Sequence, residues 1–460
     1  MPQLVRIEVD GMLGRFDHVV PFPEDWEFVI IHGPNGVGKT KFLELLSATF
    51  NFQIGRIASI PFQKARFDFD DGASLRVTKV VASPEEIRPR RARNVSLHSG
   101  INLHFEILGV KGPKISWTSQ SDISPSSARL RQFLMQVAPV QRIGGDRYQD
   151  MSNGDLLSFI EVLDKYGHML PQELSPVAER PAELKDFLAQ TKVYLIETQR
   201  LLNLPTRVSN IQTRPAPDAE LPQSRVSYYS DDLSRRLREA LAQNSRRSQE
   251  LDRTFPLRLL QGNTSVKVTD DQIRRKYAQQ DQLRARLAEI DVAQASSGYF
   301  PLPERSLEPW ERRVLWTYLE DTERKLETFK DVLDRVRLLK EIVNSRFKYK
   351  TLRISREQGF LVETNDTGQE IPPDRLSSGE QHELVLAYDL LFQVQEKTVV
   401  LIDEPEISLH VGWQRQFLYD LVEIAKVTSL RFVIATHSPQ IIHKWRERTV
   451  PLVPKSEMDD

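Results

Sequence analysis

The eight residues from Gly33 to Thr40, Gly-Pro-Asn-Gly-Val-Gly-Lys-Thr, match the pattern G-x-x-x-x-G-K-[ST] at every fixed position. Glycines in such a segment let backbone N–H groups turn onto phosphate oxygens at the start of a helix. The lysine of the pattern reaches the β- and γ-phosphates, and the hydroxyl that follows it holds Mg²⁺. The predicted nucleotide-binding residues, which we call the phosphate loop, are Gly33, Pro34, Asn35, Gly36, Val37, Gly38, Lys39 and Thr40.

The segments on both sides of the phosphate loop have the character that this chemistry requires. Phe28–Ile31 is a short apolar run that predicts a buried strand, and the apolar residues of Phe42–Leu46 have helical spacing. A glycine-rich turn that arose by chance is the alternative interpretation. Because both flanks are correct, we favour a binding site for a nucleoside triphosphate.

A second group of candidate residues follows the apolar run Thr398–Ile402, which is typical of a parallel strand covered on both faces. This run ends in Asp403 and Glu404, which we call the acidic pair. An aspartate at the end of such a strand can reach the Mg²⁺ sphere, and the glutamate beside it can orient or deprotonate an attacking water. Taken alone, the acidic pair fits a surface turn equally well; together with the phosphate loop it predicts ATP hydrolysis.

Two further segments complete the set. Leu376–Glu380 (Leu-Ser-Ser-Gly-Glu) precedes a segment with helical spacing, and we call it the signature segment. Arg431–Thr436 predicts a strand that ends at His437. A histidine at a strand end is more often structural than catalytic. The order of the four motifs along the chain favours a functional role for this one.

The rest of the chain has a β-rich beginning and a helical middle. Residues 3–31 predict strands, and the alternating residues of 51–118 predict more of them, among them Gln53–Ile57. Asp70-Asp71-Gly72 is a hairpin-turn signal. Residues 125–190 predict mainly helices and loops, and 193–196 predict another strand.

The proline-rich segment 203–226 predicts an extended connector, and long charged helices follow from about residue 228. Thr269–Gln272 has the pattern of a capping box. A single helix of about 40 residues is predicted over 307–346, and its apolar residues step by four and three, which favours a coiled-coil seam over an ordinary core stripe. Gln358-Gly359 lies between two alternating runs and predicts a hairpin over 351–364.

Composition sets limits on the class of protein. The chain has 460 residues, of which 40% are hydrophobic and 28% charged, as in globular proteins. The net charge of −1 gives no general argument for nucleic-acid binding, and for the basic cluster Arg88–Arg93 we favour a solvated loop over a phosphate-backbone contact. The chain has no cysteine, which excludes disulfides and zinc–thiolate sites. It has no apolar run of about 20 residues and no apolar signal region, so we expect a cytoplasmic protein.

With its four motifs in this order, the chain resembles the ABC-type ATPases, and among them the SMC/RecF/OLD branch. The resemblance implies an α/β fold, in which a P-loop ATPase head of two lobes is interrupted by a short helical or coiled-coil insertion. The implied domains are 1–225 for the N-terminal part of the head, 226–348 for the insertion and 349–460 for the C-terminal part.

The resemblance also implies ATP and Mg²⁺ as ligands and gives each motif a role. Lys39, Glu404 and His437 would be catalytic, and Thr40 and Asp403 would hold the metal. Ser377 and Gly379 would bind the ATP held by an opposite head, which predicts a homo-oligomer. Gln199 would be the glutamine-loop residue that contacts nucleotide and metal, with Gln141 as the alternative.

Differences from the motifs and domains of other ABC-type ATPases narrow the choice of subfamily. His410 stands where transporters have an aspartate, and Ser378 replaces a glycine of the signature. The insertion is too short for an SMC arm, and only residues 438–460 follow His437, so we expect any nuclease partner to be a separate polypeptide. The chain therefore resembles stand-alone OLD-like ATPase subunits of anti-phage systems, such as the PARIS type, which pair with a TOPRIM nuclease and respond to a phage-encoded trigger. The alternative is a RecF- or SMC-like ATPase that clamps or repairs DNA; a transporter motor is disfavoured.

Overall fold

The structure is a computed structural model that describes residues 2–23, 26–81, 101–109, 115–119, 128–144, 147–151, 156–166, 169, 181–197, 224–261, 268–290, 292, 302–407 and 409–452. The chain forms two compact units. The first unit combines Met1–Pro222 with Val394–Asp460, and the second is the continuous segment from 223 to 393. The second unit begins near the expected start of the helical insertion and continues past residue 348.

A five-stranded parallel sheet forms the centre of the first unit. Its strand order is β11 (Val193–Glu197), β15 (Val399–Asp403), β16 (Arg431–Ala435), β3 (Phe28–His32) and β17 (Thr449–Pro451). The three central strands are apolar and almost fully buried, as expected when both faces are covered. Asp403 pairs with Ala435, and Ala435 pairs with Ile31. The phosphate loop and the acidic pair therefore leave the sheet at the same edge.

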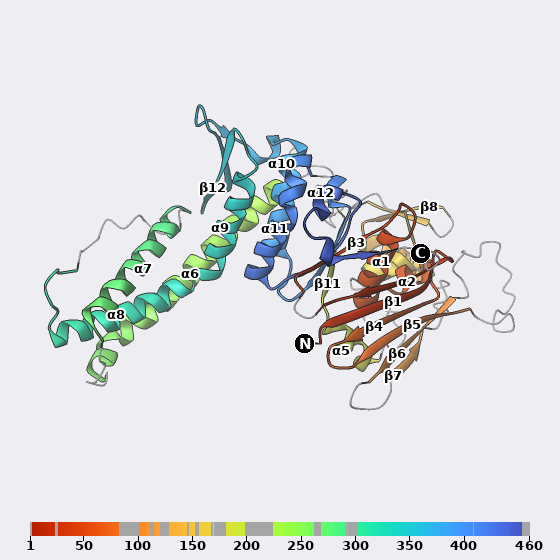
Figure 1. The fold of residues 1–460 in the computed structure, drawn as a ribbon, viewed down its shortest axis with the longest axis horizontal. Coiled ribbons are helices and arrows are strands. Elements are labelled where there is room, and N and C mark those ends of the chain that lie inside the picture. Colours follow the sequence, from red (N-terminus) through yellow and green to blue (C-terminus); the bar gives the residue numbers. More distant parts are fainter. Residues whose placement is uncertain are drawn as a thin grey trace. The chain divides into compact units, whose positions relative to one another are not determined.

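Helix α1 (Lys39–Phe50) lies between this sheet and a second, antiparallel one. The six antiparallel strands, in spatial order, are β2 (Phe16–Pro21), β1 (Leu4–Met12), β4 (Lys64–Phe69), β5 (Ser74–Val81), β6 (Ile101–Leu108) and β7 (Ile115–Thr118) (Figure 1). Most residues of α1 are buried, and its apolar side chains share one core with Ile7 of β1 and Val433 of β16. This burial fixes the start of α1 against the phosphate loop.

The other face of the parallel sheet is covered by α11 (Val411–Thr428). The Trp445 ring lies 5.1 Å from the ring of Phe28 in β3 and 5.5 Å from that of Tyr419 in α11. Helices therefore cover both faces of the sheet. This arrangement confirms the predicted fold class, an α/β P-loop ATPase head into which a helical segment is inserted.

Two predictions for the first unit are wrong in detail. Gln53–Ile57 is not a strand, because Ile54–Ser59 forms helix α2; Ile54, Ile57 and Ile60 are three residues apart, which also fits a helix. The segment 125–190 contains a three-stranded sheet that the sequence did not predict. Its elements are α3 (Ala128–Val137), β8 (Val140–Gly144), β9 (Arg147–Asp150), β10 (Leu156–Ser158), α4 (Phe159–Tyr166) and α5 (Ala182–Ala189). Strand β8 buries only Val140, so it carries no alternating pattern.

The second unit contains three long helices that pack side by side, followed by a small sheet (Figure 1). Its elements are α6 (Arg225–Gln261), α7 (Asp270–Ala288), α8 (Pro309–Glu327), α9 (Lys330–Asn344), β12 (Lys350–Ser355), β13 (Gly359–Thr364), β14 (Glu370–Ile371), the 3-10 turn η4 (Pro373–Arg375), α10 (Ser378–Tyr388) and the π-helical turn η5 (Asp389–Gln393). The predicted capping box is confirmed at Thr269, and the predicted hairpin is confirmed as β12–β13.

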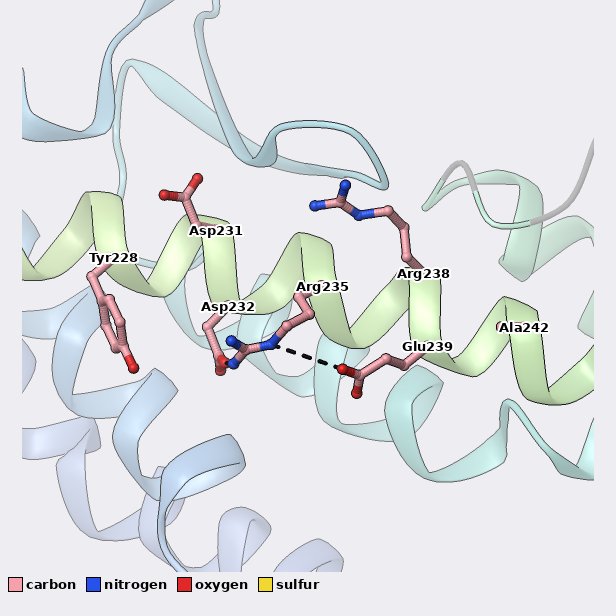
Figure 2. A pocket seen from close by; sticks show the side chains of 7 residues that line it. All are labelled: Tyr228, Asp231, Asp232, Arg235, Arg238, Glu239 and Ala242. Atoms are coloured by element: carbon pink, nitrogen blue, oxygen red, sulfur yellow. Dashed lines mark hydrogen bonds and ion pairs between the residues drawn. The ribbon is translucent and has the colours of Figure 1, made fainter.

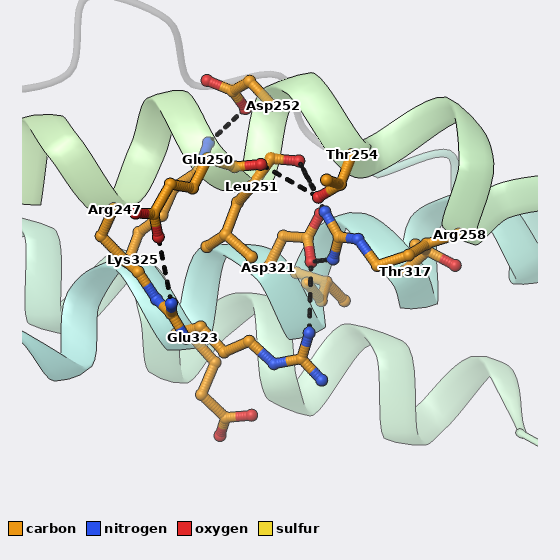
Figure 3. A network of polar contacts seen from close by, with 12 residues as sticks. Arg247, Glu250, Leu251, Asp252, Thr254, Arg258, Thr317, Asp321, Glu323 and Lys325 are labelled. Carbon is orange, nitrogen blue, oxygen red and sulfur yellow. Dashed lines mark hydrogen bonds and ion pairs between the residues drawn. The ribbon is translucent and has the colours of Figure 1, made fainter.

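Ion pairs join α6 to α8 (Figure 3). The carboxylate of Asp321, which is buried, accepts a hydrogen bond from Arg258 of α6, and Arg324 lies 3.8 Å from the same oxygen. Lys325 donates to Asp252 at 2.6 Å. A buried carboxylate that loses its partner is strongly destabilising, so this network fixes how the two helices align along their length.

The single helix predicted over 307–346 is wrong, because the segment forms α8 and α9 with a break at Thr328–Phe329. The longest described helix is instead α6, with 37 residues. The carbonyl of Lys325, which would accept from Phe329 in a continuous helix, accepts from Asn244 of α6 at 2.6 Å and from the Thr328 hydroxyl at 2.7 Å. Phe329 N–H turns to Leu326 instead. The predicted apolar stripe is buried nonetheless, at positions such as Leu319, Leu333 and Val336.

The turn between β12 and β13 provides a test of packing in the second unit. Gly359 has φ +76°, and a Cβ there would lie 1.9 Å from the carbonyl oxygen of Ser230 in α6. The Ser230 hydroxyl also donates to Gln358 O and accepts from Phe360 N–H. Gly359→Ala should therefore lower the free energy of unfolding by about 2–4 kcal/mol, from overpacking together with left-handed strain.

Gly368→Ala is the matched control for this variant. Gly368 has φ +67°, and nothing lies within 4 Å of the added Cβ, so this change should cost only about 1 kcal/mol. Urea denaturation of both variants measures the difference. Equal losses in the two variants would show that the contact with Ser230 does not limit this position.

Candidate active site

The phosphate loop connects β3 to α1 through two residues in the left-handed region. Gly36 has φ +85° and Gly38 has φ +96°, a backbone that glycine adopts without steric cost. A Cβ at Gly36 would meet no atom within 4 Å, so this part of the loop borders open space. Gly38 is the N-cap of α1 and provides no side-chain cap. The first N–H groups of α1 are thus not capped by that residue and can bind an anion.

Lys39, the first residue of α1, folds back across the loop. Its Nζ donates to the carbonyl oxygens of Gly33 at 2.9 Å and Pro34 at 3.1 Å, and it lies 2.5 Å from His437 Nε2. Burial lowers the pKa of Lys39, and the carboxylates of the acidic pair oppose that shift. The Lys39 amine therefore lies at the loop beside carboxylates that favour its charged form.

Thr40 and Asp403 are brought together by the shared sheet edge, although 363 residues separate them. The Thr40 hydroxyl donates to Asp403 Oδ2 at 2.9 Å. Burial raises the pKa of Asp403 to about 6, the Thr40 hydrogen bond opposes this shift, and the nearby charges of Glu404 and Glu44 add to it. A carboxylate in such surroundings gains from a cation, so the pair fits the Mg²⁺ site that the sequence predicts.

The rest of the metal environment must come from the ligand and water. Among the described residues, no group of three or more histidine and acidic side chains forms a metal site. Mg²⁺ is usually bound by one or two protein oxygens together with substrate phosphates and several waters. Thr40 and Asp403 suit this kind of site and do not suit a permanent protein-only metal centre.

Glu404 and His437 face each other at the same edge. Glu404 has φ +46°, which is rare for a residue other than glycine, and its N–H donates to the carbonyl of Ala435 at 2.8 Å. Glu404 Oε1 and His437 Nε2 are 3.9 Å apart, and both side chains are about one-third exposed. A partly exposed carboxylate beside the loop is placed to receive a proton from water.

Glu406 is a site residue that the sequence analysis missed. It lies in the 3-10 turn η6 (Pro405–Ile407), and its carboxylate accepts from the Thr436 hydroxyl at 2.8 Å and from the His437 N–H at 2.7 Å. Ser438, the N-cap of α12 (Pro439–Ile442), donates to Gln414 of α11 at 2.7 Å. This network holds the backbone of His437. A third acid just after the acidic pair was the available signal, but its partners lie in a separate segment, just after β16.

The signature segment lies in the second unit and is ordered by its own contacts. Ser377 is the N-cap of α10, and its N–H and hydroxyl both donate to Glu380 Oε2 at 2.9 Å. Lys350 of β12 donates to both oxygens of the same carboxylate, at 3.0 and 2.8 Å. Burial opposes but does not prevent a lowered pKa for Glu380, because Lys350 and Ser377 bind its ionised form. Ser377 is exposed and Gly379 half-buried, so the start of α10 is ordered and accessible.

The predicted glutamine and the basic cluster cannot be placed. Gln199 and Arg88–Arg93 lie outside the described residues, and their roles stay predictions. Strand β11 ends at Glu197, which pairs with Asp403. The alternative, Gln141, is exposed on β8 in the separate three-stranded sheet. His410, where transporters have an aspartate, is the N-cap of α11 and accepts from Gly412 N–H.

A shallow groove of about 580 Å³ runs along α6 and is lined by residues of that helix alone (Figure 2). Arg235 contacts Asp232 and lies 3.9 Å from Glu239. Arg235 thus lies between two carboxylates of the groove, and no predicted site residue lines it. In the part of the chain that the structure describes, no helix is long and apolar enough to cross a membrane.

Comparison with known proteins identifies the family to which the chain belongs. A glycine loop that follows one strand of a parallel sheet, with an acidic pair at the same edge at the end of another strand, defines the class of P-loop ATPases. Residues 210–443, just over half of the chain, match the family described as "AAA domain, putative AbiEii toxin, Type IV TA system". The chain belongs to this family and is an ATPase of the AAA/ABC type. The matched residues include the acidic pair but not the phosphate loop. The family match and the phosphate loop are therefore independent observations.

Two solved structures are also similar to the chain. The SMC head domain of Pyrococcus furiosus, with an extended coiled coil and bound to the C-terminal domain of ScpA, has 13% sequence identity and a TM-score of 0.34, with 98% of this chain and 93% of that chain covered. The SMC head domain of Thermotoga maritima has 10% identity and a TM-score of 0.32, with 97% and 92% covered. At TM-scores this low the similarity does not bear on fold or function.

The raised pKa of Asp403 has a consequence for stability. The folded protein holds this proton more tightly than the unfolded chain does, so the free energy of unfolding falls as the pH rises from 3.8 to about 6 and stays lower above that range. Asp403→Asn should raise the thermal midpoint of the nucleotide-free protein at pH 7.5 by a few degrees, on the order expected for a small gain. The same variant should lose stabilisation by Mg²⁺-ATP.

Differential scanning fluorimetry at pH 5 and pH 7.5, with and without Mg²⁺-ATP, measures both effects. The exposed substitution Asp10→Asn is the control and should change neither midpoint. A lower midpoint for Asp403→Asn without nucleotide would contradict the expected cost of the buried charge.

Proposed function

We propose that this protein is an ATP-operated switch that pairs through its heads and controls a separate effector protein, in keeping with an anti-phage defence role. The observation that carries the proposal is the meeting of Lys39, Thr40, Asp403, Glu404 and His437 at one edge of the parallel sheet. This grouping supports a role for each of these side chains in ATP binding or hydrolysis.

In the proposed reaction, the loop N–H groups and the Lys39 ammonium bind the β- and γ-phosphates, and Thr40 with Asp403 would hold Mg²⁺. Mg²⁺ held by these two side chains would supply positive charge beside the phosphates. Glu404 accepts a proton from a water that attacks the γ-phosphorus, and ADP leaves. Glu406 keeps His437 beside Glu404 and Lys39, where the imidazole can contact the γ-phosphate.

The signature segment supports pairing as part of the same switch. Ser377 and Gly379 are ordered and accessible at the start of α10, which suits them to bind the terminal phosphate of ATP held by another copy. In that arrangement ATP joins two heads, and hydrolysis separates them. Two states with different affinity for ATP are what a switch requires.

The proposed switch acts on a second protein, the effector. The family description names the toxin of a toxin–antitoxin system, one member of a pair of proteins. That description is compatible with a separate partner, which we propose to be a TOPRIM-type nuclease released on contact with a phage-encoded trigger. A DNA-clamping ATPase would instead show hydrolysis stimulated by DNA, with steep salt dependence.

Glu404→Gln should lower kcat for ATP hydrolysis by about 10²- to 10⁴-fold, because the proton acceptor is lost, while ATP stays bound. Steady-state phosphate release and a filter-binding assay measure the two properties.

Lys39→Ala should weaken ATP binding about tenfold or more, because charge-assisted bonds to phosphate are removed. Glu423→Gln, a surface change in α11, is the control. Hydrolysis by Glu404→Gln at the wild-type rate would exclude Glu404 as the base.

Ser377→Arg should prevent ATP-dependent pairing while ATP binding to the single chain persists, because the added side chain blocks the phosphate of the opposite copy. Light scattering of the Glu404→Gln background, with and without Ser377→Arg, measures pairing after addition of Mg²⁺-ATP. Thr367→Arg places the same charge at an exposed turn of the second unit and should leave pairing unchanged. Loss of ATP binding by Ser377→Arg would contradict a role in the opposite site.

A further inference from the structure

His18 of β2 is a buried histidine that contacts the phosphate loop from behind. Its side chain is 2% exposed, and Nε2 lies 2.8 Å from the carbonyl oxygen of Val37. Val37 stands between Gly36 and Gly38, the two left-handed glycines. His18 therefore binds the carbonyl that lies between these two glycines.

The hydrogen bond fixes the direction of the neighbouring amide. In a trans peptide the C=O and the following N–H point in opposite directions. Because the Val37 carbonyl points to the buried His18, the N–H of Gly38 points away from His18. Gly38 tolerates either sign of φ, so its own sterics do not prevent this peptide from rotating.

The protonation state of His18 suits a donor at Nε2. Burial lowers the pKa of His18, while the Val37 carbonyl and the charge of Asp17 oppose that shift. Nδ1 is buried and has no hydrogen-bond partner among the described residues. The neutral ring can satisfy the Val37 carbonyl only if its proton is on Nε2. The Phe16 ring stacks against the imidazole at 6.0 Å and holds its plane.

Packing around Gly38 supports the same orientation. A Cβ at this position would lie 2.9 Å from Met12 Cγ and 3.4 Å from Leu13 Cδ1. The β1–β2 hairpin thus backs the loop closely on one side. A Cβ at Gly36, by contrast, would meet no atom within 4 Å, so the loop is open to a ligand at that residue.

We propose that His18 is a positioning residue of the phosphate site, whose Nε2–H holds the Val37–Gly38 peptide so that the Gly38 N–H donates to a phosphate of the nucleotide. This inference rests on the proposed nucleotide-binding role of the loop. His18 touches no ligand; it selects one of two peptide orientations that the glycines would otherwise permit. A histidine that serves only the core would affect stability and leave nucleotide affinity alone.

His18→Phe and His18→Gln separate these roles. Phenylalanine keeps a flat ring against Phe16 and removes the donor, whereas glutamine keeps an N–H donor at a similar reach. Isothermal titration calorimetry with Mg²⁺-ATP should show about tenfold weaker binding for His18→Phe, the loss of one charge-assisted bond, and binding within about threefold of wild type for His18→Gln. His104→Phe, on the same antiparallel sheet, should bind as wild type.

Thermal unfolding without nucleotide accompanies each titration. Wild-type affinity for a folded His18→Phe protein would overturn the proposal, and so would equal losses for His18→Phe and a folded His18→Gln. If His18→Phe does not fold, His18→Leu supplies a smaller side chain without a donor, and the same comparison applies. Lys39→Ala tests the loop itself: unchanged ATP binding there would refute the nucleotide site, whereas weak binding there with a normal His18→Phe would refute only the role of His18.

Discussion

The parallel pairing of β3, β15 and β16 is the constraint on which the rest of the structure depends. In this register, Ile31, Asp403 and Ala435 come to the same edge of the sheet, although the chain between them includes the whole second unit. The entropic cost of closing a long loop grows only slowly with its length. An inserted unit of any moderate size can therefore be accommodated, provided that the strands on either side still pair as β11 and β15 do.

Charge at that edge is balanced against burial. Three carboxylates and one ammonium lie in a partly dehydrated space, where burial shifts the pKa of Asp403 upward and that of Lys39 downward. Both shifts reflect groups that would be better solvated in water, and they are relieved by ligands of complementary charge. The site therefore sacrifices some stability in the free protein, a common property of sites that must bind a highly charged substrate.

The sequence predicted those parts of the structure whose signal is local. The phosphate loop, the apolar strands and the capping box at Thr269 each lie within a few consecutive residues. The helix break at Thr328 was not predictable in this way. It depends on Asn244, a residue of another helix that donates a hydrogen bond to the carbonyl of Lys325. Glu406 and His18 were missed for the same reason. Glu406 contacts residues just after β16, and His18 contacts the phosphate loop, and the sequence around each residue does not indicate these partners.

The left-handed backbone of Glu404 has a consequence for the evolution of this site. Most side chains disfavour φ +46°, whereas glycine, asparagine and aspartate adopt such angles most easily. Drift at this position is therefore channelled by the main chain before chemistry is considered. Descendants that abandon hydrolysis and keep only nucleotide binding should carry one of these three residues more often than alanine or a β-branched residue, so a pseudo-enzyme lineage would be recognisable from this single column of an alignment.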